Sequence, residues 1–314
     1  MEEQLKADLK RSGFKKKKMF DGIFIACVLA LPILHFLVFY VGVNFNSILL
    51  AFKTFDSKTG NYVFAGFVNF KTFLSDLTGE QLMSICFKNS LTLYFVGLLI
   101  GMPLNILIAF CVFKKIPFEG FFRVVLFLPS IISSIVFVLI FKYFIDYGYP
   151  EVMGKLHVTD YPNLLADPRY AFGTIIFYGL WTGFGSGVIL YSNAMTRIPV
   201  SLIEYDRLEG VGAIKELFTV VIPLIFPTIT TFLVTGVAGL FTGSGAVFSF
   251  FREDAPSHLY SFGYYLFVKV IGSHSSLADY PYAAAAGLFF TCVAAPITFM
   301  VKWALEKFGP SVEY

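Results

Sequence analysis

The sequence predicts an all-α polytopic membrane protein with six transmembrane helices. Of its 314 residues, 57% are apolar and only 14% are charged, and the mean hydropathy is +0.73. This composition excludes disorder and argues against a soluble globular domain. Six runs reach the roughly 20 apolar residues that a helix needs to cross the hydrocarbon core. They lie at residues 23–43, 90–112, 124–145, 170–194, 220–241 and 282–301.

Lysine and arginine are distributed unevenly between the connections, and this predicts the orientation of the helices. Both termini and two connections on the same side, 113–123 and 195–216, hold 15 of the 24 Lys and Arg residues. The positive-inside rule makes this side cytoplasmic, so we expect both termini inside the cell. The opposite side carries the three longer connections, at residues 44–89, 142–169 and 244–281.

The N-terminal segment, 1–22, is basic and is expected to lie on anionic lipid. It begins like a signal peptide, but the apolar run at 23–43 is too long and has no cleavage site after it. We therefore expect this run to remain as the first transmembrane helix. At the other end, residues 307–314 are expected to form a cytoplasmic tail.

The outer segment, 44–89, contains a predicted amphipathic helix at 66–77. Its apolar face is formed by Phe67, Phe70, Leu74 and Leu77. Such a helix lies either at the outer membrane interface or as a cap over the bundle, and both arrangements predict the same pattern.

Small residues recur at helical spacing in the fourth and fifth spans. Gly179, Gly183 and Gly187 follow one another at intervals of one turn, and Gly239 and Gly243 continue the pattern in the fifth span. Such stripes let helix backbones approach closely, either within the chain or against a second subunit. The hydroxyl residues of these spans are costly to expose to lipid, so some of them must face a cavity or another helix.

A polar stretch at 201–223 separates these two spans. Its first residues form a Ser-x-x-Glu capping box that ends at Glu204 and predicts the start of a helix. Gly210 offers the left-handed conformation that ends a helix, and a second short helix is expected from about Gly212. The first helix has an apolar edge made by Leu202, Tyr205 and Leu208. This helix–glycine–helix elbow is either an ordinary capped loop or a docking element.

Motifs for catalysis and nucleotide binding are missing from the sequence. Nothing fits the phosphate loop G-x-x-x-x-G-K-[ST], the zinc motif H-E-x-x-H or the nucleophile elbow G-x-S-x-G. The four cysteines are scattered and indicate buried hydrophobic positions. We therefore predict no catalytic residue, no metal site and no cofactor in this chain. The membrane topology explains the net charge of +3, so no nucleic-acid partner is expected.

The six predicted spans contain no acidic residue. Carriers driven by protons or sodium usually need membrane-embedded carboxylates, so this absence weighs against a self-powered carrier. Uphill transport by this chain would need an energy source from outside, and a partner docked on the elbow would provide it.

The elbow resembles the E-A-A…G…I-x-L-P loop of permease subunits in binding-protein-dependent ABC importers. Glu204, Gly210 six residues later and Pro223 thirteen residues beyond the glycine match its spacing. The carbohydrate-uptake branch is also similar at Asn69-Phe70, Asn89-Ser90-Leu91, Phe121-Phe122-Arg123, Leu128-Pro129, Trp181, Tyr282-Ala283-Ala284-Ala285 and Val312-Glu313-Tyr314. The resemblance covers about 70–314 and is strongest to the first of two paired permeases in an oligosaccharide importer.

The resemblance implies the type I ABC importer permease fold, with a core domain at 90–306, in the bacterial plasma membrane. It implies a sugar or oligosaccharide as solute and a coupling loop at 199–216. The implied partners are a homologous second permease, two cytoplasmic ATPase subunits that use ATP and magnesium, an extracytoplasmic sugar-binding protein and membrane lipid.

The resemblance also implies two groups of site residues. The residues expected to couple to the ATPase are Glu204, Tyr205, Asp206, Arg207, Leu208 and Gly210. Those expected along the substrate path are Gly179, Gly183, Ser186, Thr235, Gly239 and Thr242. The chain departs from the family pattern at Tyr205 and Asp206, where alanines are usual, and at Glu209, where an aspartate is usual. These departures put the local shape of the docking surface in question.

Alternatives remain for the solute and for the class of protein. A permease for glycerol phosphate, a polyamine or an amino acid would share the same loop. A secondary carrier, a channel or an intramembrane enzyme would lack an associated ATPase.

Overall fold

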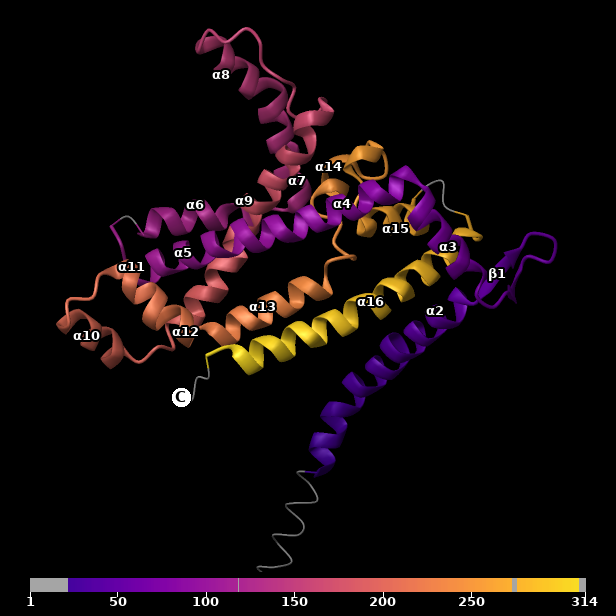
Figure 1. The fold of residues 1–314 in the computed structure, drawn as a ribbon, viewed down its shortest axis with the longest axis horizontal. Helices are drawn as coiled ribbons and strands as arrows, with labels where there is room; N and C mark the ends of the chain where they lie inside the picture. Colours follow the sequence, from indigo (N-terminus) through magenta and orange to yellow (C-terminus); the bar gives the residue numbers. More distant parts are fainter. Residues whose placement is uncertain (1–21, 118, 273–275, 311–314) are drawn as a thin grey trace, which may run out of the picture.

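The computed structural model describes residues 22–117, 119–272 and 276–310, which form a helical bundle with one β-hairpin (Figure 1). In this part of the chain, four helices are long and apolar enough to span a membrane, and two bent helix pairs bring the number to six if each pair is one span. The predicted all-α membrane fold is confirmed, with four to six helices in the described residues that can span a membrane. The orientation of the termini remains a prediction.

The first span, Gly22–Ala51, is longer than predicted and contains the π-helix η1 (Phe36–Gly42) and α2 (Val43–Ala51). Its apolar side chains are exposed over most of its length. The helix contacts the bundle through α2, which lies against α16 (Asp279–Phe308), and then diverges from it (Figure 1).

The outer segment contains a hairpin that the sequence analysis missed. Strands β1 (Lys53–Asp56) and β2 (Asn61–Phe64) pair antiparallel, with Lys53 opposite Phe64. The Asp56 carboxylate closes the turn by accepting hydrogen bonds from the Lys58 backbone N–H and the Thr59 hydroxyl, both at 2.9 Å. Gly60 ends the turn at a φ of 68°. The signal for this hairpin was a short run of turn-forming residues between two short strands.

The predicted outer helix is α3 (Val68–Gly79), but its buried face differs from the predicted apolar stripe. Asn69 and Phe73 are buried, whereas Phe67 and Leu74 are exposed. The Asn69 amide donates to the carbonyl oxygens of Ala51 and Lys53, and the Phe73 ring lies 5.4 Å from that of Phe290 on α16. These contacts attach α3 to one end of the bundle, and its position at the membrane interface stays a prediction.

The second span is one helix, Gln81–Phe113, made of α4 (Gln81–Val96), the π-helix η2 (Gly97–Gly101) and α5 (Met102–Phe113). It starts nine residues before the predicted boundary at 90, in the segment assigned to the outer loop.

The third span, predicted at 124–145, is bent. It consists of α6 (Glu119–Ile131) and α7 (Ser134–Tyr143), and the axes of the pair are bent by 113°. Pro129 removes a backbone donor near the end of α6, and Ser133, with a ψ of 130°, leaves the helical conformation just before α7. The helix then continues through η3 (Phe144–Gly148) and α8 (Tyr149–Lys155), which project away from the bundle (Figure 1).

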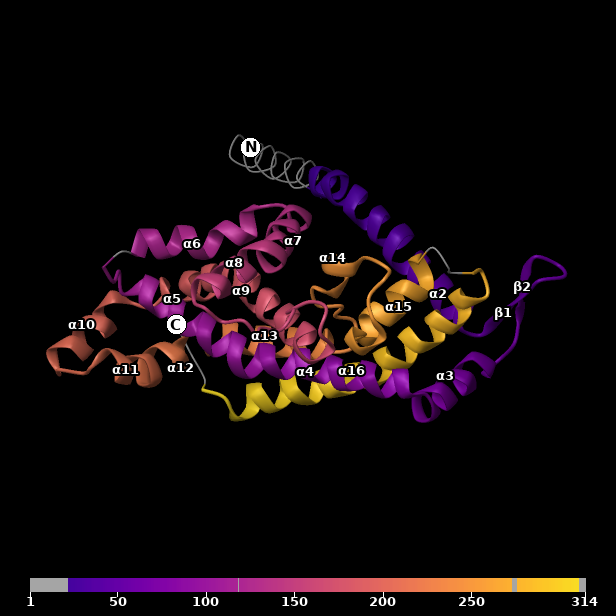
Figure 2. The same cartoon turned by 90° about the horizontal axis from the view of Figure 1, so that it is seen from above.

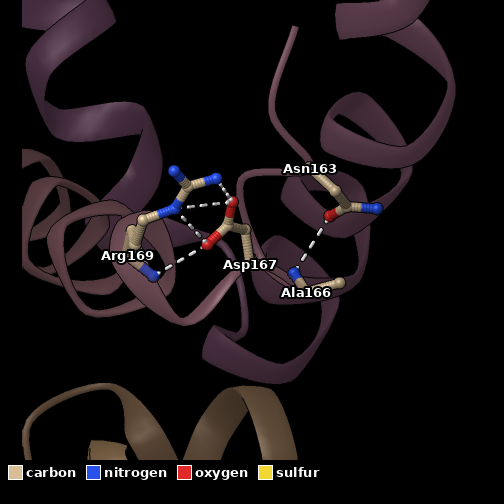
Figure 3. A network of polar contacts seen from close by, with 4 residues as sticks. All are labelled: Asn163, Ala166, Asp167 and Arg169. Atoms are coloured by element: carbon tan, nitrogen blue, oxygen red, sulfur yellow. Dashed lines mark hydrogen bonds and ion pairs between the residues drawn. The ribbon is translucent and has the colours of Figure 1, made fainter.

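The fourth span is α9 (Pro168–Met195), close to the predicted 170–194. Figure 3 shows the side chains that fix its first turn. The Asp167 carboxylate accepts from the Arg169 backbone N–H at 2.9 Å and from its guanidinium at 2.6 Å. The guanidinium lowers the pKa of Asp167, so the carboxylate stays charged at the helix N-terminus, where negative charge is favoured. Just before it, Asn163 accepts from the Ala166 N–H.

The elbow follows as α10 (Val200–Leu208) and α11 (Ala213–Glu216). The fifth span is then broken into the π-helix η4 (Leu217–Val221), α12 (Ile222–Leu224) and α13 (Phe226–Ala238), with a bend of 71°. Pro223 and Pro227 flank this bend. Because α13 ends at Ala238, the predicted end of the span at 241 is wrong, and Gly239 and Thr242 lie in the turns that follow.

The connection predicted as an outer loop at 244–281 is largely helical. It contains α14 (Val247–Phe251), the 3-10 helix η5 (Ser257–Leu259) and α15 (Phe262–Ile271). The Lys142 ammonium of α7 donates to the Phe250 carbonyl at 2.9 Å and so fixes the end of α14. Leu259, Phe262 and Tyr264 are fully buried, which makes this connection part of the core.

Phe73 of α3 and Phe67, the residue just before this helix, give a matched test of this packing. We expect Phe73→Ala, at a site with 0% exposure, to destabilise the protein by about 3–5 kcal/mol, because it leaves a cavity among aromatic rings. Phe67→Ala, at 72% exposure, should cost less than about 1 kcal/mol. Thermal unfolding of the purified protein in detergent measures both. Equal losses in the two variants would contradict the observed face of α3.

Candidate functional site

A cavity of about 540 Å³ lies between the second span, α9 and α13. Its wall is rich in glycine, at positions 97, 101, 179, 183, 187, 236, 239, 243 and 245. The polar side chains on the wall are Ser90, Tyr94, Asn105 and Tyr191. Among the described residues that line the cavity, none is acidic or basic. A concave, mainly apolar wall with a few polar groups is typical of a small-molecule site.

The glycines of α9 do two different things. A Cβ at Gly179 or Gly183 would meet no atom within 4 Å, so these glycines widen the cavity. A Cβ at Gly185 would lie 2.6 Å from the Ser130 hydroxyl of α6, and one at Gly187 would overlap the Asn105 amide of α5. The second pair of glycines therefore lets α5 and α6 approach α9 closely. The predicted packing within the chain is found at Gly187, whereas packing of Gly179 and Gly183 against a second subunit stays a prediction.

Half of the predicted substrate-path residues line this cavity, namely Gly179, Gly183 and Gly239. The other half do not. Ser186 and Thr242 are exposed and donate to carbonyl oxygens of their own chain segments. Thr235 donates to the Thr231 carbonyl and lines a separate cavity between α13 and α16.

The second span contributes cavity residues that the sequence analysis did not select. The Asn105 amide donates to the Gly101 carbonyl at 2.8 Å, while its oxygen has no hydrogen-bond partner among the described residues. On α9, the ring of Tyr191 lies 5.0 Å from that of Phe232 on α13. The glycines at 97 and 101 were the available signal, since they place small residues on the helix that carries Asn105.

The elbow lies between two helices, α9 and α13, that both line the cavity. Gly210 has a φ of 70°, so the predicted left-handed turn is confirmed. The predicted capping box is wrong, because α10 begins at Val200 and Ser201 lies within its first turn. The Leu202 N–H instead bonds to the Pro199 carbonyl.

The apolar edge of α10 is exposed. Ile203 is buried in the core beneath the elbow, whereas Leu202, Tyr205 and Leu208 face outward, with Leu208 89% exposed. Ile214 and Phe218 extend the exposed apolar surface beyond the turn. Exposed apolar patches of this kind mark interaction sites.

Polar groups surround this edge. Glu204 is exposed, and Asp206 is half-buried with one carboxylate oxygen lacking a partner among the described residues. The side chain of Arg207 lies outside the described part of the structure. Tyr205 and Glu209, two of the departures from the family pattern, hydrogen-bond to each other across one turn, and this bond raises the pKa of Tyr205. The two unusual residues therefore form one local unit.

No group of three or more His, Cys, Asp or Glu side chains in the described residues is placed to hold a metal ion.

Comparisons with known proteins agree on one family. Residues 97–314 match the family described as "Binding-protein-dependent transport system inner membrane component". The "Multiple sugar-binding transport system permease protein MsmF" of Streptococcus mutans is 25% identical over 282 residues, which cover 89% of this chain and 94% of that protein.

Two solved structures resemble the fold. A bacterial ABC transporter involved in import of the acidic polysaccharide alginate has a chain that superposes with a TM-score of 0.76 at 21% identity, covering 93% of this chain and 98% of the other. A bacterial alginate ABC transporter in complex with an alginate pentasaccharide-bound periplasmic protein gives 0.75 at 20% identity, covering 93% and 97%. These two similarities concern the fold.

The glycines of α9 provide a test of the cavity. Gly187→Ala should destabilise the protein by about 1–3 kcal/mol, because the methyl group would overlap Asn105. Gly183→Ala should be neutral or stabilising, since the methyl group enters open space and alanine favours helix by up to about 1 kcal/mol. Thermal unfolding of the two variants compares sites one turn apart on one helix. A Gly187→Ala variant as stable as Gly183→Ala would contradict the packing described.

Proposed function

The chain belongs to the family of binding-protein-dependent transport system inner membrane components, and from this premise we propose that it is a permease subunit that imports a sugar or oligosaccharide. Such a subunit is a component of a transporter rather than an enzyme, and it sits in the plasma membrane. The observation that carries the proposal is the connection between the cavity and the elbow. The elbow at 199–216 is the segment that links α9 to α13, and both of these helices line the cavity.

The proposed docking surface for an ATPase is the exposed side of the elbow. Leu208 and Tyr205 offer apolar contact area, and Glu204 adds a charge that a cationic group on the partner can pair with. Gly210 fixes the angle between α10 and α11. The chain has no phosphate loop of its own, so ATP and magnesium would be used by two cytoplasmic ATPase subunits. Asp206 and Arg207 belong to the same proposed surface.

Transport requires that ATP binding favours one conformation of the cavity over another. A docked ATPase shifts this equilibrium only if it binds the elbow with different affinity in the two conformations. Movement of the elbow would reach α9 and α13 directly, because it is continuous with both. Between the elbow and α13 the helix is irregular at two places, the π-helix η4 and the bend at Ile225.

The solute is proposed to occupy the cavity, with a homologous permease closing the open side. The aromatic rings of Tyr94, Tyr191 and Phe232, all on the cavity wall, offer faces for sugar rings. The described residues that line the cavity carry no charge, which argues against glycerol phosphate, polyamines and zwitterionic amino acids, the charged alternatives. Ser186, Thr235 and Thr242 remain candidate contacts for solute at other stages of transport.

The proposed docking site for an extracytoplasmic binding protein is the surface formed by α8 and the connection at 244–281. A similar fold was solved with an oligosaccharide-bound periplasmic protein. Helix α8 projects from the bundle, and the neighbouring Tyr147 is exposed (Figure 1).

The function is tested by purifying this chain from its native membrane and reconstituting the associated proteins in liposomes. We expect an ATPase and a second permease to co-purify, and uptake of sugar to require both ATP and the loaded binding protein. The double variant Glu204→Lys with Gly210→Pro should insert normally but hydrolyse ATP without uptake, because the docking charge is reversed and proline cannot adopt a positive φ. Normal uptake by this variant would refute the coupling role. Uptake without any ATPase would indicate a secondary carrier.

The solute site is tested by filling the cavity. Gly183→Phe should reduce uptake by at least about tenfold by occupying the space beside Gly179, while complex assembly stays intact. Ile189→Phe, at an exposed position of α9 outside the cavity, is the matched control and should transport normally. Unchanged uptake by Gly183→Phe would remove this cavity from the solute path.

A further inference from the structure

A buried ion pair connects two segments that lie far apart in the sequence. The Lys114 ammonium lies 2.5 Å from a carboxylate oxygen of Glu216, and the side chains are 16% and 2% exposed. By contrast, the pairs Lys302–Glu306 and Lys155–Glu151 join residues one helical turn apart, and all four of their side chains are more than half exposed. Exposed pairs of that kind contribute little, whereas a buried pair constrains its surroundings.

Lys114 is placed by the turn that ends α5. It is the C-cap residue of that helix, and its ammonium also lies 5.6 Å from the centre of the Phe110 ring. The next residue, Lys115, has a φ of 52°, a left-handed conformation that is uncommon for a residue other than glycine. A strained turn is thus maintained at the point where Lys114 reaches across to α11.

Glu216 is the last residue of α11 and the one before the π-helix η4. At 2% exposure it is out of reach of a protein docked on the elbow, so any role it has is exerted inside this chain. Its second carboxylate oxygen is buried and has no hydrogen-bond partner among the described residues. A buried carboxylate is costly, and an apolar pair would often be at least as stable. Stability alone therefore does not account for this ion pair.

The ion pair gives the elbow a second route to the cavity. Helix α5 carries Met102 and Asn105 on the cavity wall and packs along α9. The covalent chain links the elbow to α9 and α13 but not to α5. Figure 1 shows α11 beside the turn between α5 and α6, and Figure 2 shows α10 and α11 at the same end of the bundle as that turn. The Lys114–Glu216 pair fastens α11 to the turn.

We propose that the Lys114–Glu216 pair is a strut that makes the end of α5 move with the elbow. All three helices of the cavity wall, α5, α9 and α13, then shift together when a docked partner moves α10 and α11. Lys114 and Glu216 are positioning residues, since neither contacts solute or nucleotide. This inference rests on the proposed transport function.

The test measures the number of solute molecules imported per ATP hydrolysed by the reconstituted complex. Glu216→Gln keeps the side-chain shape and removes the charge, and we expect this ratio to fall by about fivefold or more while the ATPase still co-purifies. Lys114→Gln should have the same effect, and Lys114→Arg, which keeps the pair, should restore the ratio.

Reversal of the pair separates the strut from a general effect on folding. Glu216→Lys and Lys114→Glu should each lower the ratio, and the double variant should recover to within about twofold of the original protein. Lys302→Gln and Glu306→Gln remove an exposed pair at the end of α16 and serve as matched controls with no expected change. Should Glu216→Gln not accumulate in the membrane, the double variant Lys114→Gln with Glu216→Gln decides, because it leaves neither charge buried without a partner.

Three results would overturn the strut. The first is an unchanged number of solute molecules per ATP in Glu216→Gln and Lys114→Gln. The second is a charge-reversed double variant whose ratio is no higher than that of the single variants. The third is loss of the ATPase from the Glu216→Gln complex, which would indicate that Glu216 is a docking residue. If the unmodified complex showed no ATP-dependent uptake, the proposed function would fail and the strut with it. If the unmodified complex imports solute normally and the Lys114 and Glu216 variants keep the same number of solute molecules per ATP, the strut is refuted but the proposed function stands.

Discussion

The close approach of α5 and α6 to α9 is the contact on which the rest of the architecture depends. It is possible because Gly185 and Gly187 present no side chain at the points where Ser130 and Asn105 reach the α9 backbone. In a membrane, water does not drive helices together, so such short-range packing decides which helices associate. Since these contacts hold one part of α9 tightly, Gly179 and Gly183 on the same helix can leave a cavity open.

The cavity and the elbow belong to one mechanical unit. Ile203 of the elbow and Leu217, the residue that follows it, are buried in the same core that contains Val188 of α9 and Ala109 of α5. The exposed side, with Leu208 and Tyr205, is left for a partner. A closely packed core transmits displacement because it has little free volume to absorb it. The proposed strut adds a directional contact to this unit.

Much of the fold and part of the site could be predicted from local patterns. Apolar length located the helices, and Gly210 located the turn of the elbow, since only a local backbone property was required. The break between α6 and α7 and the early end of α13 could not be located, because lipid tolerates proline and glycine in spans and neighbouring helices decide whether a helix continues. Similarly, Thr235 and Gly239 share one predicted span, yet they line different cavities.

The sequence by itself determined a helical membrane protein with a charged elbow between its fourth and fifth spans, and the spacing of Glu204, Gly210 and Pro223, together with the other matching segments, indicated the family. These properties depend on composition and on residues close together in the chain. Only the tertiary structure decided which glycines pack and which open the cavity, and it alone joined Lys114 to Glu216. The physical reason is that such contacts depend on the relative rotation of helices distant in sequence, which periodicity within one helix does not specify.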